Sequence, residues 1–287
     1  MSDHLISPYG GTSIDPIVDE ERRLELKAHS RDWPSWDLTQ RQLCDLEMLV
    51  SGAFSPLKTF MSRPDYEMVR DDMRMGDGTL WPIPITLDVP AGIASQLDNG
   101  SSLALRDPEG VVLAILHVKY LWQPDLQLEA ESVYGTMNRG HPSVAMLLDS
   151  NRHWYVAGEL EGLQAPLHYA YSELRHTPAE LRAIFQQRGW RKIVAFQTRN
   201  PLHRAHLELT LRAANEAEAN LLIHPVVGMT KPGDVDHYTR VRCYQAIMPR
   251  YPPGTAILPL LPPALPMGAP PASPLPPFRP RASPPWR

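Results

Sequence analysis

The chain has 287 residues, with 28 Lys and Arg against 32 Asp and Glu and a hydrophobic fraction of 43%. Because this length is about twice that of a typical domain, two domains are the natural expectation. The formal net charge of −4 argues against a protein held on nucleic acid or on an anionic membrane by bulk charge. No basic segment precedes an apolar core at the N-terminus, so no secretory signal is expected. No stretch approaches about 18 uninterrupted apolar residues, so no transmembrane span is expected either.

Only two cysteines are present, Cys44 and Cys243. Two thiols supply neither a disulfide framework nor a Cys-based zinc site. A reducing compartment is the simpler interpretation. Together with the missing signal, it predicts a cytoplasmic enzyme or binding module.

The N-terminal part of the sequence reads as β-rich with short helices. Between residues 38 and 50, apolar residues recur at three- and four-residue spacing, which is typical of a helix. Residues 78–89 alternate in polarity but contain two prolines, so they predict an edge or irregular strand. Residues 102–120 predict a hairpin, because two strand-like runs flank the turn-forming residues 107–110. Several short strands of this kind indicate a small barrel or sandwich.

The character of the sequence changes at about Pro166. Residues 177–180 fit a capping box with proline at the first helical position, and Gly189 suits the end of that helix. Residues 193–196 then predict a short buried strand, residues 203–217 a helix, and residues 221–227 a second strand. Strand, helix and strand over so short a distance predict a βαβ unit in a parallel sheet.

Polar side chains follow directly after Phe196, the predicted end of the first strand, where ligands of parallel sheets bind. Arg199 offers a planar fork for two oxygens of a phosphate or sulfate, and its hydroxyl and amide neighbours add neutral donors. His203 and His206 are three residues apart, so in the first turn of a helix both side chains would face the loop. There they could donate to phosphate oxygens beside the N–H groups of the helix N-terminus. The candidate site residues are Gln197, Thr198, Arg199, Asn200, His203 and His206.

Plainer interpretations of this loop stay open. A helix N-terminus beside an arginine is often merely capped. The histidine pair could also bind a metal, but helical metal pairs usually need i, i+4 spacing and a third ligand. We therefore assign no metal site.

A second polar loop runs from Gly228 to Arg242, after the second predicted strand ends at Val227. Asp234 and Asp236 are placed either to fix its cations or to cap the next helix, and a simple solvated loop is the alternative. Both polar loops leave the same edge of the inferred sheet, so they predict a basic cleft suited to a polyphosphate rather than to nucleic acid. The cationic residues of this loop are Lys231, His237, Arg240 and Arg242.

At this point a family resemblance emerges. The string QTRNPLHRAH (197–206), followed by HPVVGMTKPGDVDHYTRVRCYQA (224–246), closely resembles the ATP sulfurylase, or sulfate adenylyltransferase, family. The N-terminal strings DLEMLVSGAFSPLKTFM, DGTLWPIPITLDV and VYGTMNRGHPSV resemble the same family. The likeness runs from about residue 7 to residue 252.

The resemblance implies an α/β protein in which a PUA-like β-barrel domain (1–167) precedes an incomplete Rossmann-like nucleotidyltransferase domain (168–257). It implies that sulfate is joined to the α-phosphorus of ATP to give adenosine 5′-phosphosulfate and diphosphate, with Mg²⁺ carried on the ATP. By motif, Gln197 and Arg199 are implied to bind sulfate, and Thr198, Arg199 and Asn200 to stabilise the transition state. The implied ATP contacts are Gln197, Thr198, Arg199, Asn200, His203 and His206.

The sequence departs from the family after about residue 257. Of the 31 prolines, 14 fall within residues 252–287, a segment that also lacks Asp, Glu and Lys. A Gly-Arg-Asp-His string expected of the family is absent. The interpretation is a truncated or frame-shifted chain whose residues 258–287 form a disordered Pro-rich tail. Such a chain is expected to have little or no adenylylation activity. A genuine proline-rich extension that binds a partner is the alternative.

Two rival functions stay open at this stage. Another nucleotidyltransferase of the same fold would use a different acceptor, and a non-catalytic PUA-like module would bind RNA or a partner. The resemblance favours ATP and sulfate as ligands, a homo-oligomer as in other family members, and contact with neither nucleic acid nor membrane.

Overall fold

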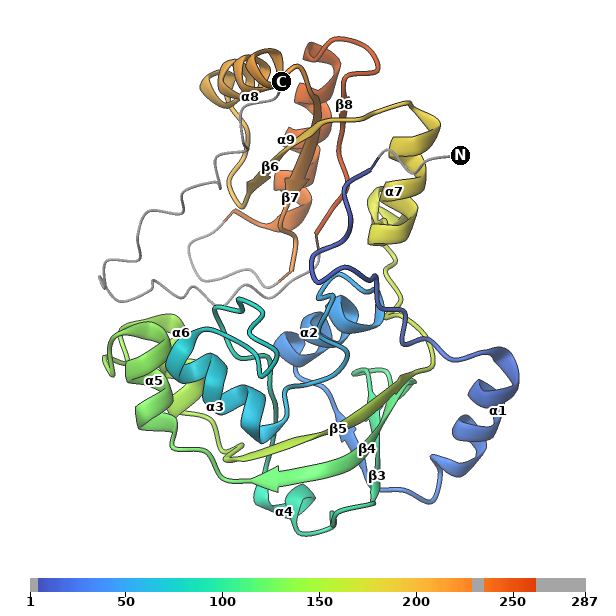
Figure 1. Cartoon of the computed structure of the whole chain (residues 1–287), viewed down its shortest axis with the longest axis vertical. Helices are drawn as coiled ribbons and strands as arrows, with labels where there is room; N and C mark the ends of the chain where they lie inside the picture. The colour runs from blue at the N-terminus through green and yellow to red at the C-terminus, as the bar shows by residue number, and fades with distance from the viewer. Residues whose placement is uncertain (1–4, 229–234, 262–287) are drawn as a thin grey trace. The chain divides into compact units, whose positions relative to one another are not determined.

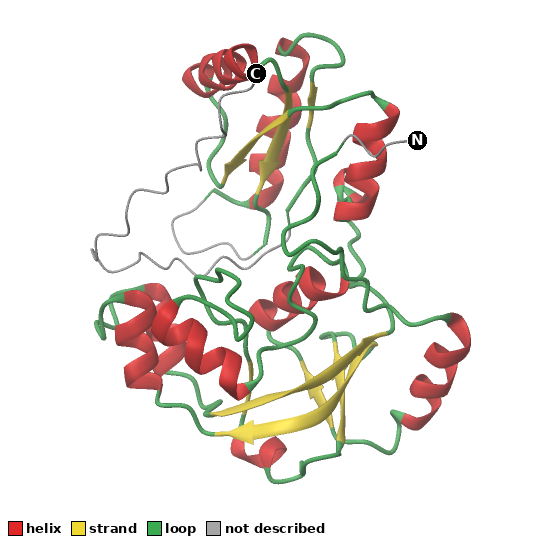
Figure 2. Cartoon of the chain, viewed as in Figure 1, coloured by secondary structure: helices red, strands yellow, loops and turns green. Residues whose placement is uncertain are grey.

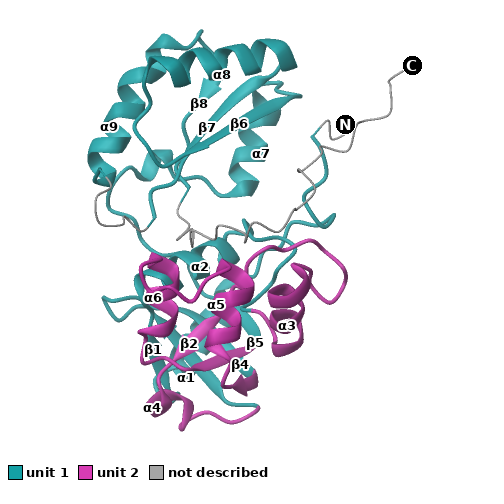
Figure 3. Cartoon of the chain, turned by 90° about the vertical axis from the view of Figure 1, so that its left-hand side faces the viewer, with its two compact units in different colours: residues 1–60, 100–118, 158–265 teal, residues 61–99, 119–157, 266–287 magenta. Residues whose placement is uncertain are grey.

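The computed structural model describes residues 5–228 and 235–261. Its residues fall into two compact units, which Figure 3 distinguishes by colour. Unit 1 comprises residues 1–60, 100–118 and 158–265, and unit 2 comprises residues 61–99, 119–157 and 266–287. The domain bounds inferred from the sequence stay a prediction. The disordered tail was predicted to begin at residue 258, but Leu258 and Leu260 are buried and Leu261 forms a bridge with Val226, so residues 258–261 belong to the fold. The rest of the predicted tail, from position 262 onward, lies outside the described residues.

A five-stranded sheet organises the N-terminal part (Figure 2). Its order is β1-β3-β4-β5-β2. The predicted hairpin is confirmed, because β3 pairs antiparallel with β4. The segment with two prolines is confirmed as an edge, because its only strand, β2, pairs with β5 at the end of the order. The strands are β1 (Ser35–Asp37), β2 (Leu87–Val89), β3 (Ser102–Arg106), β4 (Val112–Trp122) and β5 (Trp154–Gly162).

Six short helices accompany this sheet (Figure 1). The predicted helix at 38–50 is confirmed as α2, which Thr39 and Gln42 start with a capping box. Leu46 and Leu49 of α2 are fully buried, as their helical spacing requires. The helices are α1 (Glu20–His29), α2 (Gln40–Val50), α3 (Arg63–Asp72), α4 (Ala91–Ala94), α5 (Leu126–Tyr134) and α6 (Pro142–Leu148).

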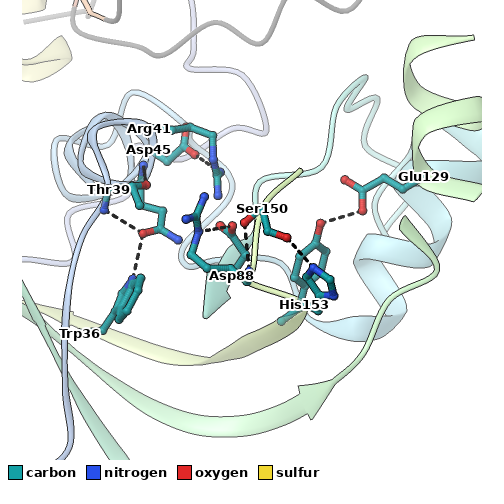
Figure 4. A network of polar contacts seen from close by, with 11 residues as sticks. Trp36, Thr39, Arg41, Asp45, Asp88, Glu129, Ser150 and His153 are labelled. Carbon is teal, nitrogen blue, oxygen red and sulfur yellow. Dashed lines mark hydrogen bonds and ion pairs between the residues drawn. The ribbon is translucent and has the colours of Figure 1, made fainter. Parts of the chain in front are cut away.

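Several polar side chains in the N-terminal part are joined by hydrogen bonds and ion pairs, as the network in Figure 4 shows. In unit 2, the Glu129 carboxylate accepts hydrogen bonds from the hydroxyls of Tyr66 at 2.9 Å and Tyr155 at 2.8 Å. In unit 1, the guanidinium of Arg41 pairs with Asp45 at 2.7 Å, one helical turn along α2. Since these carboxylates are satisfied by their neighbours, they act as structural residues.

A three-stranded parallel sheet of order β6-β7-β8 organises the C-terminal part of unit 1. The predicted capping box at Thr177 and Glu180 is confirmed, and Gly189 takes the left-handed conformation, φ +67°, just beyond the helix. The elements are η1 (Ser172–Leu174), α7 (Pro178–Gln187), β6 (Ile193–Thr198), α8 (Arg204–Ala217), β7 (Asn220–Pro225), α9 (His237–Ile247), η2 (Met248–Arg250) and β8 (Ala256–Ile257).

Helices cover both faces of this sheet (Figure 3). On one face, Leu181 and Phe185 of α7 pack with Leu222. On the other face, side chains of α8 and α9 pack with Leu221 and Ile223. The βαβ prediction is therefore confirmed, with strand β7 buried between two helical layers as parallel sheets require.

Three details differ from the sequence prediction. Strand β6 is only half-buried rather than buried, because it forms one edge of the described sheet whereas β7 is central. Strand β6 also continues to Thr198, two residues beyond the predicted end. Strand β7 stops at Pro225, and Val226 continues the pairing only as an isolated bridge to Leu261.

Within the described residues, none of the helices has both the length and the apolar character that crossing a membrane demands.

Candidate active site

The strand-to-helix loop predicted as the site begins inside the sheet rather than after it. Gln197 and Thr198 are the last residues of β6 and lie in register with His224 and Pro225 of β7. Arg199 and Asn200 form the bend that follows, and Leu202 anchors the loop in the core at 8% exposure. The six predicted site residues thus occupy one continuous bend at the carboxyl end of β6, where parallel sheets bind their ligands.

The hydroxyl of Thr198 closes this bend on itself. It accepts a hydrogen bond from the backbone N–H of Asn200 at 3.1 Å and donates to the carbonyl oxygen of the same residue at 3.2 Å. A short polar side chain that bonds the backbone two residues ahead is a common turn device. Thr198 therefore stabilises the bend and fixes the backbone positions from which the side chains of Arg199 and Asn200 extend.

Helix α9 holds the same bend from inside the protein. One guanidinium nitrogen of Arg240, Nη1, donates to the carbonyl oxygens of Arg199 and Val226, both at 3.0 Å. The hydroxyl of Tyr244 donates to the carbonyl of Asn200 at 3.0 Å. Arg240 is 1% exposed. These bonds tie the carboxyl ends of β6 and β7 to one helix, so the backbone under the candidate site is fixed by buried donors.

The buried position of Arg240 corrects the prediction that this residue lines a basic cleft. Its charge is used by two backbone carbonyls, so it does not face a ligand. The sequence did not reveal that Arg240 holds backbone carbonyls, because a run of charged residues does not show which of them is buried. One feature of the sequence could have indicated this role: Arg240 and Tyr244 are four residues apart, which places both on one face of a helix.

The two histidines cap helix α8 reciprocally. His203 is the N-cap residue, and its Nδ1 accepts the N–H of Ala205 at 3.3 Å. The Nδ1 of His206 accepts the N–H of His203, also at 3.3 Å. Their rings lie 4.0 Å apart between centroids. The capping interpretation is therefore correct for the Nδ1 atom of each ring. His203 lies just before the helix, whereas the sequence placed it in the first helical turn.

This arrangement sets the tautomer of both histidines. A ring nitrogen that accepts a hydrogen bond carries no proton, so the hydrogen-bond network assigns the proton of each neutral ring to Nε2. Burial, followed by the nearby charge of His203, lowers the pKa of His206 from its ordinary value. A neutral imidazole that accepts at Nδ1 keeps an N–H donor at Nε2, which suits a phosphate oxygen.

The second polar loop is described only at its two ends. Asp236 caps α9, because its carboxylate accepts the N–H of Thr239 at 2.9 Å, which confirms one of the two predicted roles for this residue. Burial, then the neighbouring charges of Arg240 and Arg175, lowers the pKa of His237. Arg242 is exposed. Lys231 and Asp234 lie outside the described residues.

The donor set of the first loop fits anions rather than a hard cation. Its six predicted site residues offer one guanidinium, one hydroxyl, two amides and two imidazoles, whereas Mg²⁺ prefers carboxylate and carbonyl oxygens. Over residues 5–228 and 235–261, no group of three or more His, Cys, Asp or Glu side chains is placed to hold a metal ion.

Fold and site together define an α/β nucleotide-binding protein, in which an anion-handling bend lies between a parallel strand and a helix N-terminus. A family model described as a PUA-like domain matches residues 6–165, and one described as ATP-sulfurylase matches residues 172–274. The chain therefore belongs to the ATP-sulfurylase family, with a PUA-like N-terminal region.

Curated relatives agree with this assignment. The chain is 50% identical over 268 residues to a sulfate adenylyltransferase of Mycosarcoma maydis, covering 92% of this chain and 47% of that protein. It is 51% identical over 267 residues to a sulfate adenylyltransferase of Saccharomyces cerevisiae, covering 91% of this chain and 52% of that protein. The chain thus spans about half the length of these relatives.

A solved structure has the same fold. The protein described as a hexameric APS kinase from Thiobacillus denitrificans superposes with a TM-score of 0.76 at 41% sequence identity. The match covers 90% of this chain and 47% of that one. Both regions of the present chain are therefore found in a relative of known structure.

Proposed function

We propose that the chain has the sulfate-adenylyltransfer chemistry of its family, in which ATP and sulfate give adenosine 5′-phosphosulfate and diphosphate. We expect a low rate in this chain, because its sequence departs from the family after about residue 257. The observation that carries this proposal is about 50% identity, over 92% of the chain, to proteins named sulfate adenylyltransferase. The anion-handling bend at residues 197–206 supports it, because both substrates are anions. The proposal concerns the reaction of the family, since the chain spans about half the length of these relatives.

The chemistry asks for alignment and charge stabilisation. Sulfate is a dianion at neutral pH with no proton to lose, so no general base is needed. It is a poor nucleophile and must approach a polyanion. Catalysis then depends on donors that hold both groups in line and stabilise the charge that develops. A bend rich in Arg, Gln and Asn, with its backbone fixed by α9, supplies such donors.

Roles for the individual residues follow from this chemistry. Gln197 and Arg199 bind sulfate, and Thr198, Arg199 and Asn200 stabilise the transition state. Thr198 acts through the bend, since its hydroxyl bonds to Asn200. The Nε2–H groups of His203 and His206 donate to phosphate oxygens of ATP, whose binding also involves residues 197–200.

Magnesium belongs to this proposal only as a companion of the nucleotide. Bound to the phosphates, Mg²⁺ would neutralise part of their charge. The residues of the bend are not magnesium ligands by type, so we assign no protein ligand and derive no step through the ion.

Assembly and location complete the proposal. We place the protein in the cytoplasm, where Cys44 and Cys243, both free thiols in the structure, remain reduced. We infer a homo-oligomer by analogy with the hexameric relative from Thiobacillus denitrificans. Its ligands are ATP and sulfate, with no nucleic-acid or membrane partner.

The decisive experiment measures exchange of labelled diphosphate into ATP by the purified chain, with and without sulfate. Exchange that needs sulfate supports the proposal. Exchange that proceeds equally well without sulfate, and that needs a carboxylate or phosphate ester instead, identifies another adenylyltransferase of the same fold. If the chain shows no exchange and does not bind ATP or sulfate in calorimetry, the proposed activity does not reside in it.

A further inference from the structure

Unit 1 contains a cavity of about 700 Å³ that is separate from the candidate active site. Its wall comes from α2, the N-terminal segment, residues 165–168, α7, strand β7 and the residues after β8, all of which belong to unit 1. None of residues 197–206 lines it. The volume lies in the range of cavities that hold small organic ligands.

Much of the cavity wall is apolar. Met48 from α2 and Leu181 and Phe185 from α7 line it, together with Leu260 from the segment after β8. All four side chains are otherwise buried, at 8% exposure or less. A wall of this kind favours an apolar body such as an aromatic ring, because such a body is stabilised by leaving water.

Both carboxylates that line the cavity are already engaged by the protein. Glu47 accepts a hydrogen bond from Nε2 of His168 at 2.7 Å. Glu180 accepts the backbone N–H of Thr177 at 2.8 Å within the capping box of α7. Each of these carboxylates therefore has a hydrogen-bond donor from the protein, and the charge of Glu47 also acts on the guanidinium of Arg175.

Arg175 and His224 differ from these carboxylates. With the described residues, the guanidinium of Arg175 makes one long hydrogen bond, from Nε to the carbonyl of Ala170 at 3.5 Å, and no ion pair. Burial lowers the pKa of its guanidinium from the ordinary value, which reflects lost hydration. The imidazole of His224, half-buried on β7, makes no hydrogen bond with the described residues. Buried polar groups are normally paired, so this pairing capacity is available to a ligand.

We propose that this cavity binds an organic anion with a compact apolar body, whose anionic group pairs with the guanidinium of Arg175 and whose body lies against Leu181 and Phe185. The planar fork of arginine selects a carboxylate, sulfonate or phosphate, since each offers two oxygens at matching spacing. His224 adds one neutral hydrogen bond. The apolar wall excludes inorganic sulfate alone as the preferred occupant.

The test titrates the full chain with three probes in calorimetry. Naphthalene-1-sulfonate carries both the ring and the anion, inorganic sulfate carries the anion alone, and 1-naphthalenemethanol carries the ring alone. We expect saturable binding of the sulfonate, with a dissociation constant on the order of 1 mM or tighter for a ligand of this size. Each of the other two probes should bind at this site at least about tenfold more weakly, because each lacks one half of the interaction.

Variants locate the binding site and separate this proposal from the proposed function. Arg175→Gln should weaken sulfonate binding roughly 10- to 100-fold, as expected for the loss of a charged hydrogen-bonding group. Arg175→Lys keeps the positive charge but loses the planar fork, so its affinity for the sulfonate should lie between those of the wild type and Arg175→Gln. Arg191→Gln removes an exposed charge outside the cavity and should bind as the wild type does. Arg199→Ala removes the anion group of the candidate active site and should also leave sulfonate binding unchanged.

Two outcomes overturn the proposal. The first is sulfonate binding that Arg175→Gln and Arg175→Lys leave intact, in variants that melt at the wild-type temperature. The second is sulfonate binding that disappears in Arg199→Ala, which would place the anion at the bend after β6. Failure of the diphosphate-exchange assay leaves these results unaffected, because they measure binding at a different place.

Discussion

Two groups of polar residues in this chain differ in burial, one inside the protein and one in the candidate active site. In unit 2, Glu129 is 5% exposed and accepts hydrogen bonds from the hydroxyls of Tyr66 and Tyr155. At the end of β6, Gln197 and Asn200 are exposed, while the backbone beneath them is held by Arg240 and Tyr244. The first group uses its hydrogen bonds to fix the fold. The second presents side chains on a fixed backbone, which is how a preorganised binding site is built.

The largest expected effect tests the exposed side of this comparison. Arg199→Ala should lower sulfate-dependent exchange roughly 100- to 1,000-fold, or about 3–4 kcal/mol, as the loss of one charge-stabilising donor does. Stability should change little, because the backbone carbonyl that Arg240 holds is retained. Exchange kinetics and urea unfolding measure the two quantities. Unchanged turnover in a well-folded variant would remove Arg199 from the site.

The next test concerns the buried support of the bend. Arg240→Met leaves the carbonyls of Arg199 and Val226 without their donor, so the free energy of unfolding should fall by about 3 kcal/mol. Arg242→Met, an exposed position on the same helix, is the matched control and should change stability by less than about 0.5 kcal/mol. Equal effects of the two substitutions in urea unfolding would mean that Arg240 does not hold the bend.

His224 is an intermediate case, because its imidazole is half-buried and makes no hydrogen bond with the described residues. Burial lowers its pKa from 6.5 to about 4. The unfolded chain therefore binds the proton more readily, and stability is lost as the pH falls from 6.5 towards 4. At about 1.4 kcal/mol per pH unit, the roughly 2.5 pH units between the two pKa values correspond to roughly 3.5 kcal/mol. Solvent around the partly exposed ring reduces the expected loss to on the order of 2–3 kcal/mol. His224→Gln should remove this loss of unfolding free energy between pH 6.5 and 4. Parallel stability curves for wild type and variant would contradict it.

The smallest expected effect tests the structural side. Tyr155→Phe removes one of the two hydroxyls that bond Glu129, and unfolding free energy should fall by about 2 kcal/mol while sulfate-dependent exchange stays unchanged. Tyr169→Phe removes a comparable hydroxyl bond to Glu109 at an exposed position and should cost less than about 0.5 kcal/mol. If Tyr155→Phe changed the exchange kinetics under conditions where the variant is fully folded, the residues around Glu129 would not be purely structural.

Local sequence signals predicted several elements correctly. The capping box at Thr177, the hairpin around residues 107–110 and the helix of residues 40–50 each depend on neighbours within a few positions. The βαβ unit followed from two apolar runs around one amphipathic stretch. These features are set by short-range chemistry, so a single sequence carries enough information to find them.

Burial and pairing could not be predicted in the same way. The sequence presents Arg240 as one cation among several, and only the packing of α9 shows that it lies under the bend. It also presents His203 and His206 as two donors, whereas the structure uses the Nδ1 of each as a helix cap. The half-burial of β6 depends on its place at an edge of the described sheet, which no local pattern records.

By itself, the amino-acid sequence determined that the chain has a parallel α/β part, a bend rich in polar donors at residues 197–206 and the motifs of a known family. These properties follow from the order of residue types along a short segment. The tertiary structure alone decided which cations face solvent and which hold backbone carbonyls, and it brought Arg175 and His224 to one cavity. Those outcomes depend on contacts between residues distant in sequence, because the cost of burying a charge is decided by what surrounds it.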